Sequence, residues 1–251
     1  MYISWPRRSY IGRTLRKSST PKSQKLSRKR EISSPQDNSR SKSREAILAA
    51  ALRVFASDGY DGASMHKIAT AAQLAAPLIN YHFGSKENLW RETIAYSLGD
   101  LRREALAIGN ATRALAPLDR LRVFLRTLTQ HAARWPDNFV MIIAEVRSHS
   151  DRFAWAQENY TGVIFQELLT ILQDAIDAKV IKKVDLNQLA SLLVGGVLVY
   201  FTANPEVFNN TNPKSLDRIS AEYTNMMVGL LLDGILNRPQ TRQTADNLNP
   251  E

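Results

Sequence analysis

Histidine is the side chain of this sequence best suited to acid–base or metal chemistry, and it occurs four times, at positions 66, 82, 131 and 149. Glu145 and His149 are spaced to share one face of a helix, and His131 falls on the preceding predicted helix. An ion pair or a polar pocket wall is a simpler interpretation of this group than a metal pair. No zinc-hydrolase, nucleophile or phosphate-loop motif accompanies these residues. We therefore expect a protein that is not an enzyme, with no metal site and no cofactor.

Side chains that suit nucleic acid are concentrated between positions 64 and 86. Asparagine, here Asn80, can pair with adenine through two hydrogen bonds, and small apolar groups such as Ala76 and Pro77 can contact a thymine methyl. Ser64 is placed to cap a helix, and the free N–H groups of that first turn can also face a phosphate. Lys67 and Arg44 are candidate contacts to the DNA backbone.

The elements that position these side chains are short helices. Residues 44–58 predict a helix, because their apolar residues repeat at i, i+3, i+4 and i+7, and Gly59 is a stop signal. Helices at 65–72 and 75–83 follow, the second with Pro77 in its first turn. Two short helices joined by a tight turn form a helix-turn-helix, whose second helix enters the major groove of DNA.

Here the sequence resembles the N-terminal domain of the TetR family of transcriptional regulators. The resemblance covers Ile47 to Trp90, about 45 of 251 residues, and depends on the combined spacing of its marks. These marks are Ala50, Phe55, Gly59, Tyr60, Ser64, Ile68, Ala69, the run Tyr81-His82-Phe83-Gly84-Ser85-Lys86-Glu87, and Leu89. The resemblance implies that Tyr81 and His82 face DNA and that Lys86 contacts the phosphate backbone.

Three positions depart from the family pattern. Gln73 stands where the tight turn usually has Gly, and in a left-handed conformation a non-Gly residue costs about 1–2 kcal/mol. Ala75 replaces the usual Ser or Thr cap, a loss of about 1 kcal/mol. Asn80 stands where the family often has Tyr, so we expect a base or water contact in place of a phosphate contact. These changes affect the pitch of the recognition helix.

The rest of the chain also predicts helices, at about 85–109, 117–135, 137–150, 151–178, 185–203 and 215–237. We therefore expect an all-α protein with four parts: a disordered basic tail at 1–40, a helix-turn-helix domain at 41–90, a helical bundle at 91–238 and a flexible C-terminal tail at 239–251. The segment Leu189–Ala203 is almost wholly apolar but shorter than the about 20 residues that span a bilayer. We expect the helices at about 185–203 and 215–237 to form a homodimer seam, with Gly195 and Gly196 allowing close approach.

Aromatic residues gather in the middle helices. The simpler interpretation is that they form an ordinary core. The functional interpretation is that they line an apolar cavity between bundle helices. The resemblance favours the second, because the family's cavities hold an inducer. The candidate ligand-binding residues are Trp135, Phe139, Glu145, His149, Trp155 and Phe165.

The positive charge of the chain lies in its N-terminal tail. Residues 1–44 hold 13 Lys and Arg against two acids, a formal charge of +11, and the remainder is −2. The helix-turn-helix segment 45–90 is itself −1. Three interpretations of residues 1–40 stay open: a DNA-seeking arm, an organellar transit peptide, which its Arg- and Ser-rich composition resembles, and an extension from a wrongly chosen start.

These features predict a cytoplasmic, sequence-specific regulator of transcription; the absence of cysteine fits a reducing compartment. Its expected partners are a palindromic operator in double-stranded DNA, a second copy of itself and an unidentified small-molecule effector, with no membrane. Members of the family are usually repressors, so we expect a repressor that leaves its operator when the ligand binds. Two alternatives are a non-specific architectural DNA-binding protein, and a helical binding protein or enzyme with an incidental helix-turn-helix.

Overall fold

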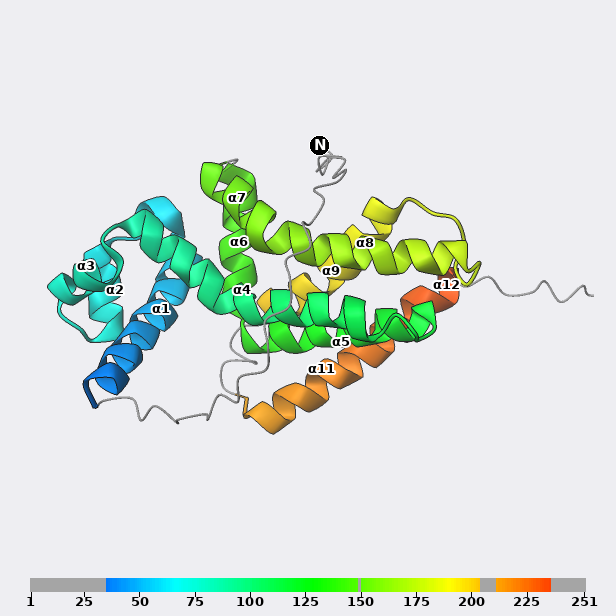
Figure 1. The fold of residues 1–251 in the computed structure, drawn as a ribbon, viewed down its shortest axis with the longest axis horizontal. Coiled ribbons are helices and arrows are strands. Elements are labelled where there is room, and N and C mark those ends of the chain that lie inside the picture. Colours follow the sequence, from blue (N-terminus) through cyan, green and yellow to red (C-terminus); the bar gives the residue numbers. More distant parts are fainter. Residues whose placement is uncertain (1–34, 149, 204–210, 236–251) are drawn as a thin grey trace, which may run out of the picture.

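The computed structural model describes residues 35–148, 150–203 and 211–235, and within these ranges the chain is helical and has no strand (Figure 1). The expected all-α fold is confirmed. Most of the predicted N-terminal tail and the whole of the C-terminal tail at 239–251 lie outside the described residues. No helix among the described residues combines the length and hydropathy needed to span a membrane.

Three helices form the N-terminal unit: α1 (Pro35–Gly62), α2 (Met65–Ala72) and α3 (Ala76–Phe83). Gly59 interrupts the regular helix of α1 with φ 69° and ψ 176°, a backbone conformation that only glycine adopts readily. The stop signal predicted at this glycine is therefore confirmed. Apolar side chains of all three helices, including Phe55, Ile68 and Ile79, are fully buried between them.

The start of α1 differs from the expectation. Sequence periodicity begins near position 41 and predicts a tail at 1–40, but the helix begins at Pro35 and therefore includes residues 35–40. Proline is well placed there because its missing N–H would be unpaired in a first turn anyway. The residues at 39–42 are exposed, so no apolar stripe marks this part of the helix.

The C-terminal bundle begins with α4 (Lys86–Ala111), which leaves the N-terminal unit and runs into the centre of the molecule (Figure 1). It continues through α5 (Pro117–Arg134), α6 (Pro136–Ser148), α7 (Asp151–Ala156), the π-helical turn η1 (Gln157–Thr161) and α8 (Gly162–Asp177). The last elements are α9 (Leu186–Thr202), α11 (Pro213–Met227), the π-helical turn η2 (Val228–Leu232) and α12 (Asp233–Ile235).

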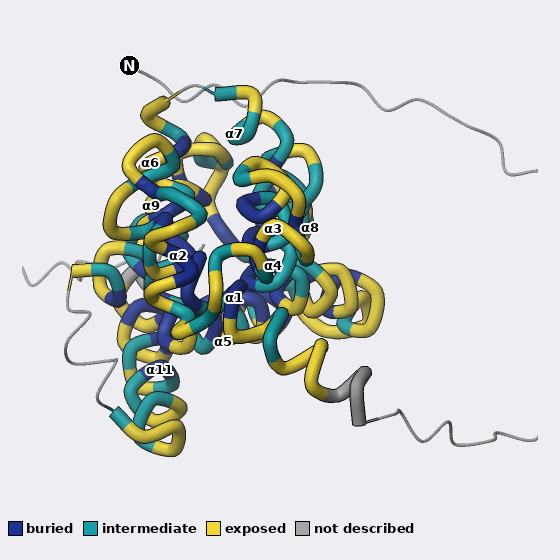
Figure 2. The backbone as a smooth tube through the Cα atoms, turned by 90° about the vertical axis from the view of Figure 1, so that its left-hand side faces the viewer, coloured by how far each residue is buried: buried dark blue, intermediate teal, exposed yellow. Residues whose placement is uncertain are grey.

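The bundle is closed by an apolar core that is continuous with that of the N-terminal unit. Figure 2 looks at the end formed by α1, α2 and α3 and shows buried backbone behind exposed outer turns. Trp90 and Ile94 of α4 are fully buried, so this helix belongs to both cores. Because interiors of this kind are close-packed, a displacement of α4 in the bundle must also move the N-terminal unit.

Candidate nucleic-acid interface and internal cavity

The helix α2 and the turn after it have well-defined end geometry. Ser64 caps α2, with its Oγ accepting a hydrogen bond from the Lys67 backbone N–H at 3.1 Å, as the sequence predicts. Gln73 ends the helix at φ 57° and ψ 39°, in the left-handed region. Its N–H donates to the Thr70 carbonyl at 3.1 Å. The turn therefore keeps the left-handed geometry that the family builds with glycine, at a cost of about 1–2 kcal/mol.

The helix α3 begins without a side-chain cap. Ala75 has the extended conformation of an N-cap residue, φ −71° and ψ 135°, but offers no hydrogen bond to the first turn. Pro77 in that turn has no N–H to satisfy. The predicted loss of a cap is thus confirmed, and α3 owes its position to packing by Ile79 and Phe83, which are buried.

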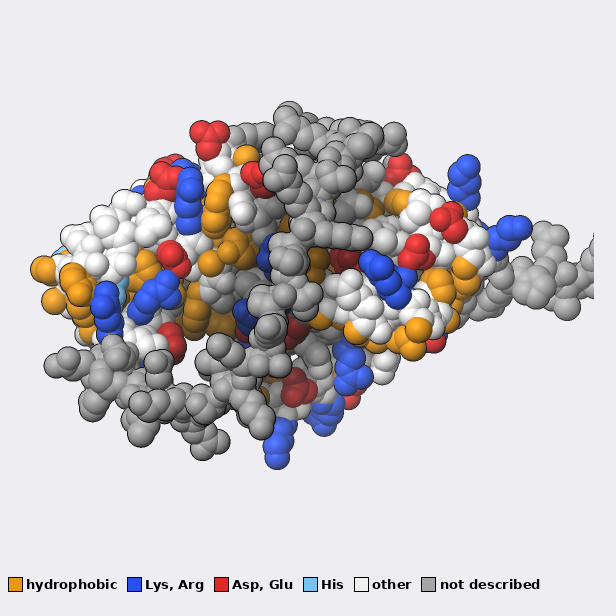
Figure 3. Space-filling view, in the orientation of Figure 1, with side chains coloured by type: hydrophobic (Ala, Val, Ile, Leu, Met, Phe, Trp, Pro, Cys, Tyr) orange, Lys and Arg blue, Asp and Glu red, His pale blue; other side chains and the backbone are white. Residues whose placement is uncertain are grey.

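One face of α3 is open to solvent. Pro77, Asn80 and Tyr81 are exposed, and the Tyr81 side chain reaches 67% exposure. These positions follow the spacing of neighbours on one helix face, and Ala76 and His82 border it half-buried. Over α2 and α3 the surface seen in Figure 3 is mostly uncharged. An exposed, uncharged helix face can enter the major groove of DNA, which is wide enough for one helix.

The surroundings of His82 favour the neutral form of its ring. Its pKa is lowered first by partial burial and then by the charges of Arg40 and Arg44. Its ring meets that of Tyr81 edge-on, with centroids 5.4 Å apart, and the Arg40 guanidinium lies 5.4 Å from the Tyr81 centroid. Arg40 thus brings a positive charge to the exposed face of α3. Sequence reasoning missed this residue because it placed position 40 in the tail.

The three cations predicted to contact the DNA backbone have different surroundings. Lys67 Nζ pairs with Asp58 Oδ2 at 2.9 Å, and Arg44 Nη2 pairs with Glu92 Oε2 at 2.7 Å. Both charges are therefore partly neutralised within the protein. Lys86 has no carboxylate partner among the described ion pairs, and its Nζ lies 4.4 Å from the ring centroid of Tyr60. It sits in the first turn of α4, where the helix end also favours an anion.

Comparison with known proteins agrees with this geometry. The profile of bacterial regulatory proteins of the tetR family matches residues 47–93, from the first helix through the start of α4. Residues 47–93 of this chain therefore match the N-terminal domain of the TetR family. The resemblance inferred from residues 47–90 is confirmed.

Relatives of known name extend the comparison. The HTH-type transcriptional regulator BetI of Agrobacterium fabrum is 35% identical over 101 residues, which cover 40% of this chain and 48% of BetI. The match therefore spans about half of that relative. The HTH-type transcriptional repressor NicS of Pseudomonas putida is 26% identical over 201 residues, 77% of this chain and 92% of NicS.

A solved structure shows the same fold over nearly its whole length. The crystal structure of HlyIIR, a hemolysin II transcriptional regulator, matches with a TM-score of 0.61 at 24% identity, covering 79% of this chain and 99% of HlyIIR. The helical bundle that follows the TetR-family domain is therefore also similar in fold to a bundle of known structure.

A cavity of about 340 Å³ lies between the helices of this bundle. Its wall is built by α4, α5, α6, α8 and α9, with Phe153 of α7 and Thr161 of η1 between them. Two of the predicted ligand-binding residues, Phe139 and Phe165, line it. The cavity has the size and the apolar walls of a small-molecule site.

The other predicted ligand-binding residues lie elsewhere. Trp135 ends α5 and meets Tyr96 edge-on at 5.3 Å. Trp155 packs against Trp90 at 6.2 Å, at the junction with the TetR-family domain. Neither tryptophan lines the cavity, because helix periodicity indicates that a residue faces inward but not which inward space it meets.

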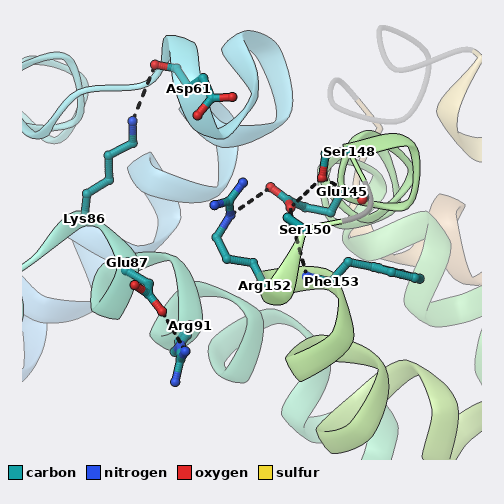
Figure 4. A network of polar contacts seen from close by, with 9 residues as sticks. All are labelled: Asp61, Lys86, Glu87, Arg91, Glu145, Ser148, Ser150, Arg152 and Phe153. Carbon is teal, nitrogen blue, oxygen red and sulfur yellow. Dashed lines mark hydrogen bonds and ion pairs between the residues drawn. The ribbon is translucent and has the colours of Figure 1, made fainter.

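Glu145 is buried, yet it too lies outside the cavity wall and belongs to a polar network (Figure 4). It accepts hydrogen bonds from Ser148 Oγ at 3.2 Å and Ser150 Oγ at 2.5 Å, and its Oε1 lies 3.4 Å from Arg152 Nε. His149, which the sequence places on one helix face with Glu145 and among the candidate ligand-binding residues, lies outside the described residues. Among the described residues no group of three metal-ligating side chains is found.

The network of Glu145 reaches the TetR-family domain through an aromatic ring. The Arg152 guanidinium of α7 lies 3.6 Å from the Tyr60 centroid, and Lys86 lies against the same ring. In Figure 4 Arg152 points toward the end of α1, whereas the neighbouring Phe153 points away from it. Phe153 lines the cavity, so adjacent residues of α7 contact the cavity and the DNA-binding unit.

Proposed function

We propose that this protein is a sequence-specific regulator of transcription that places α3 in the major groove of an operator. The observation that carries the proposal is the exposed face of Pro77, Asn80 and Tyr81 on the second helix of a TetR-family helix-turn-helix. On this proposal Asn80 reads a base, Tyr81, His82 and Ala76 contact the groove, and Lys86 and the capped start of α2 at Ser64 contact phosphates.

We infer that the protein acts as a homodimer through α9 and the helix α11 with its continuation η2. Large apolar side chains on these elements face solvent in the single chain, with Val199 65% and Leu230 72% exposed. Leu192 and Met226 extend this apolar surface. Apolar area of this kind is stabilised by burial against a partner. A twofold dimer implies a palindromic operator with half-sites about 34–36 Å apart.

Gly195 and Gly196, which we expect to allow close approach in that seam, also have surroundings within the single chain. Gly195 lines the cavity, and the carbonyl of Gly196 accepts a hydrogen bond of 2.6 Å from the Tyr223 hydroxyl of α11. A Cβ at Gly195 would meet no atom within 4 Å, and one at Gly196 would make only ordinary contacts with Tyr223 and Met227. The role of the two glycines in the seam therefore stays a prediction. The proposed seam rests on the exposed apolar residues instead.

We propose that a small molecule in the cavity releases the operator, so that the protein is a repressor. Support comes from the continuous helix α4, whose first turn carries Lys86 and whose middle lines the cavity through Leu98 and Leu101. The relative NicS is named a repressor. A ligand shifts the equilibrium only by its different affinity for the two conformers, and DNA and ligand must oppose each other by the same factor.

The decisive experiment is selection of bound sequences from a random pool of duplex DNA. We would use the full chain and a truncation that begins at residue 35, since a cut at residue 41 removes part of α1 and Arg40. A shared palindrome from both proteins supports the dimeric regulator. An enriched sequence that needs residues 1–34 shows that the arm takes part in recognition.

Enrichment of no sequence, together with a steep dependence of affinity on salt, would instead favour the architectural DNA-binding protein. The proposal would be rejected if the full chain bound no duplex at all, with or without the compounds tested below.

A further inference from the structure

The wall of the cavity is almost entirely hydrocarbon. Three lining residues carry polar side chains, namely Arg147, Thr161 and Ser191. Arg147 and Ser191 are exposed residues, whereas the hydroxyl of Thr161 is buried. Within the described part of the chain, Thr161 Oγ1 has no hydrogen-bond partner. A buried hydroxyl without a partner is costly and is uncommon in native structures.

Other threonines of the bundle show what this hydroxyl lacks. In regular helix the hydroxyl of Thr donates to the carbonyl four residues earlier, as Thr129 does to Leu125 at 2.6 Å and Thr170 does to Gln166 at 3.0 Å. The corresponding carbonyl for Thr161 is that of Gln157, which accepts from the Gly162 N–H in the π-helical turn. In this turn the Gln157 carbonyl accepts from the N–H five residues later instead of four, and the Thr161 hydroxyl makes no hydrogen bond to it.

The position of the threonine makes its hydroxyl available to a ligand. Thr161 lines the cavity, and rotation about its Cα–Cβ bond exchanges the positions of its hydroxyl and methyl groups. Threonine uses two such rotamers in helices. A ligand oxygen in the cavity can therefore supply the hydrogen bond that the protein does not. Single π-helical turns within α-helices are frequent at functional sites.

We propose that the cavity binds an uncharged, mostly apolar small molecule carrying one hydrogen-bonding oxygen, which pairs with the hydroxyl of Thr161. Burying a charge against hydrocarbon costs far more than burying a hydroxyl that finds a partner. The cationic lining residue, Arg147, is itself exposed to solvent, so a carboxylate gains little from it, and head groups of either charge are disfavoured. This inference rests on the proposed function only in taking the cavity as the effector site, and its test needs no DNA.

The test uses three eight-carbon probes that differ in their head group. Full-length protein is titrated at neutral pH with n-octanol, octanoate and octylammonium, by calorimetry and by the shift in Tm. We expect n-octanol to raise Tm and to bind at least about tenfold more tightly than either charged probe. Equal binding of a charged probe, or no shift with n-octanol, overturns the inference.

The variant Thr161→Val separates a specific hydrogen bond from general apolar binding. It removes an unpaired buried hydroxyl, so the protein without probe should be at least as stable as the wild type. Its affinity for n-octanol should fall about fivefold, the usual size of one hydrogen bond. The matched control Thr170→Val lies on α8, is exposed and does not line the cavity, and should bind n-octanol as the wild type does.

The outcomes distinguish this inference from the proposed function. Unchanged n-octanol affinity in Thr161→Val would remove the role of the hydroxyl, whatever the protein does with DNA. Tight, Thr161-dependent binding that leaves operator affinity unchanged would support the ligand site and reject ligand-controlled release.

Discussion

The N-terminal unit offers little unpaired positive charge to DNA. Segment 45–90 has a formal charge of −1. Lys67 within it and Arg44 just before it are both paired with carboxylates. Phosphate neutralisation normally dominates DNA affinity. Arg40 and Lys86, which lie against aromatic rings rather than carboxylates, are therefore the residues from which we expect this charge.

The substitution Arg40→Ala should weaken binding to the selected operator and to a scrambled duplex by similar factors. It should also lower the slope of log affinity against log salt by about one, because one phosphate contact is lost. Equilibrium binding at several salt concentrations measures both effects. Arg126→Ala, at an exposed position of α5, is the control and should change neither. A loss confined to the operator would mean that Arg40 reads bases.

Acid should destabilise the fold through His131. Burial, followed by the charge of Arg134, lowers the pKa of His131 from 6.5 to about 4. The unfolded chain takes up this proton near pH 6.5, but the folded chain does so only near pH 4. Stability is therefore unaffected well above pH 6.5 and falls as the pH drops from 6.5 toward 4, by roughly 3 kcal/mol in total.

Denaturant unfolding of the wild type and of His131→Gln across this pH range measures that contribution. Other groups also titrate in acid, so the difference between the two proteins is the informative quantity. It should be constant above neutral pH and should shift in favour of the variant as the pH falls. A difference that is independent of pH would contradict the assignment to His131.

At the scale of elements, α3 is held by packing because its N-cap is missing. Ala75 already has the extended backbone of a cap residue. Ala75→Ser should therefore raise the free energy of unfolding by about 1 kcal/mol, measured by denaturant titration. Ala114→Ser, at an exposed turn position that caps no helix, should have little effect. Equal stabilisation by both changes would show that the cap of α3 does not form.

The contact between α7 and α1 is the second element-scale feature. Arg152 bridges the buried carboxylate of Glu145 and the ring of Tyr60. A double-mutant cycle with Tyr60→Leu and Arg152→Gln should give a coupling energy of about 1 kcal/mol. The control cycle pairs Tyr60 with Arg91, which lies over Trp155 instead, and should give almost none. Zero coupling in the first cycle would remove this link between the bundle and the DNA-binding unit.

At the scale of the whole molecule, the exposed apolar surface of α9, α11 and η2 needs a partner. Val199→Glu combined with Leu230→Glu should turn a dimer into a monomer, because a carboxylate is expensive to bury against an apolar face. Sedimentation and light scattering measure the mass. Affinity for the full palindrome should fall at least about tenfold, which corresponds to about 1.4 kcal/mol of binding free energy. Affinity for a single half-site should change little.

The matched control is Leu106→Glu, at another exposed apolar position that lies on α4. It should keep the mass and the operator affinity of the wild type. A wild-type protein that is already monomeric at micromolar concentration would contradict the proposed seam.

Local patterns were sufficient to predict the helices and the family of the N-terminal domain. The apolar repeat in 44–58, the glycine at 59 and the cap at Ser64 are interactions between near neighbours in the chain, so they can be recognised without a fold. The same is true of the left-handed turn at Gln73 and the missing cap at Ala75. The start of α1 at Pro35 was not predicted, because residues 35–42 of the sequence contain no apolar repeat.

Only the tertiary structure decided which residues meet. Phe139 and Phe165 line the cavity whereas Trp135 and Trp155 do not, although all four have the same kind of apolar side chain. Arg152 reaches Tyr60, 92 positions earlier in the sequence, and Arg40 reaches Tyr81. A periodic pattern defines a buried face of each helix, but the partner of that face depends on how the helices cross, which is a property of the packed molecule.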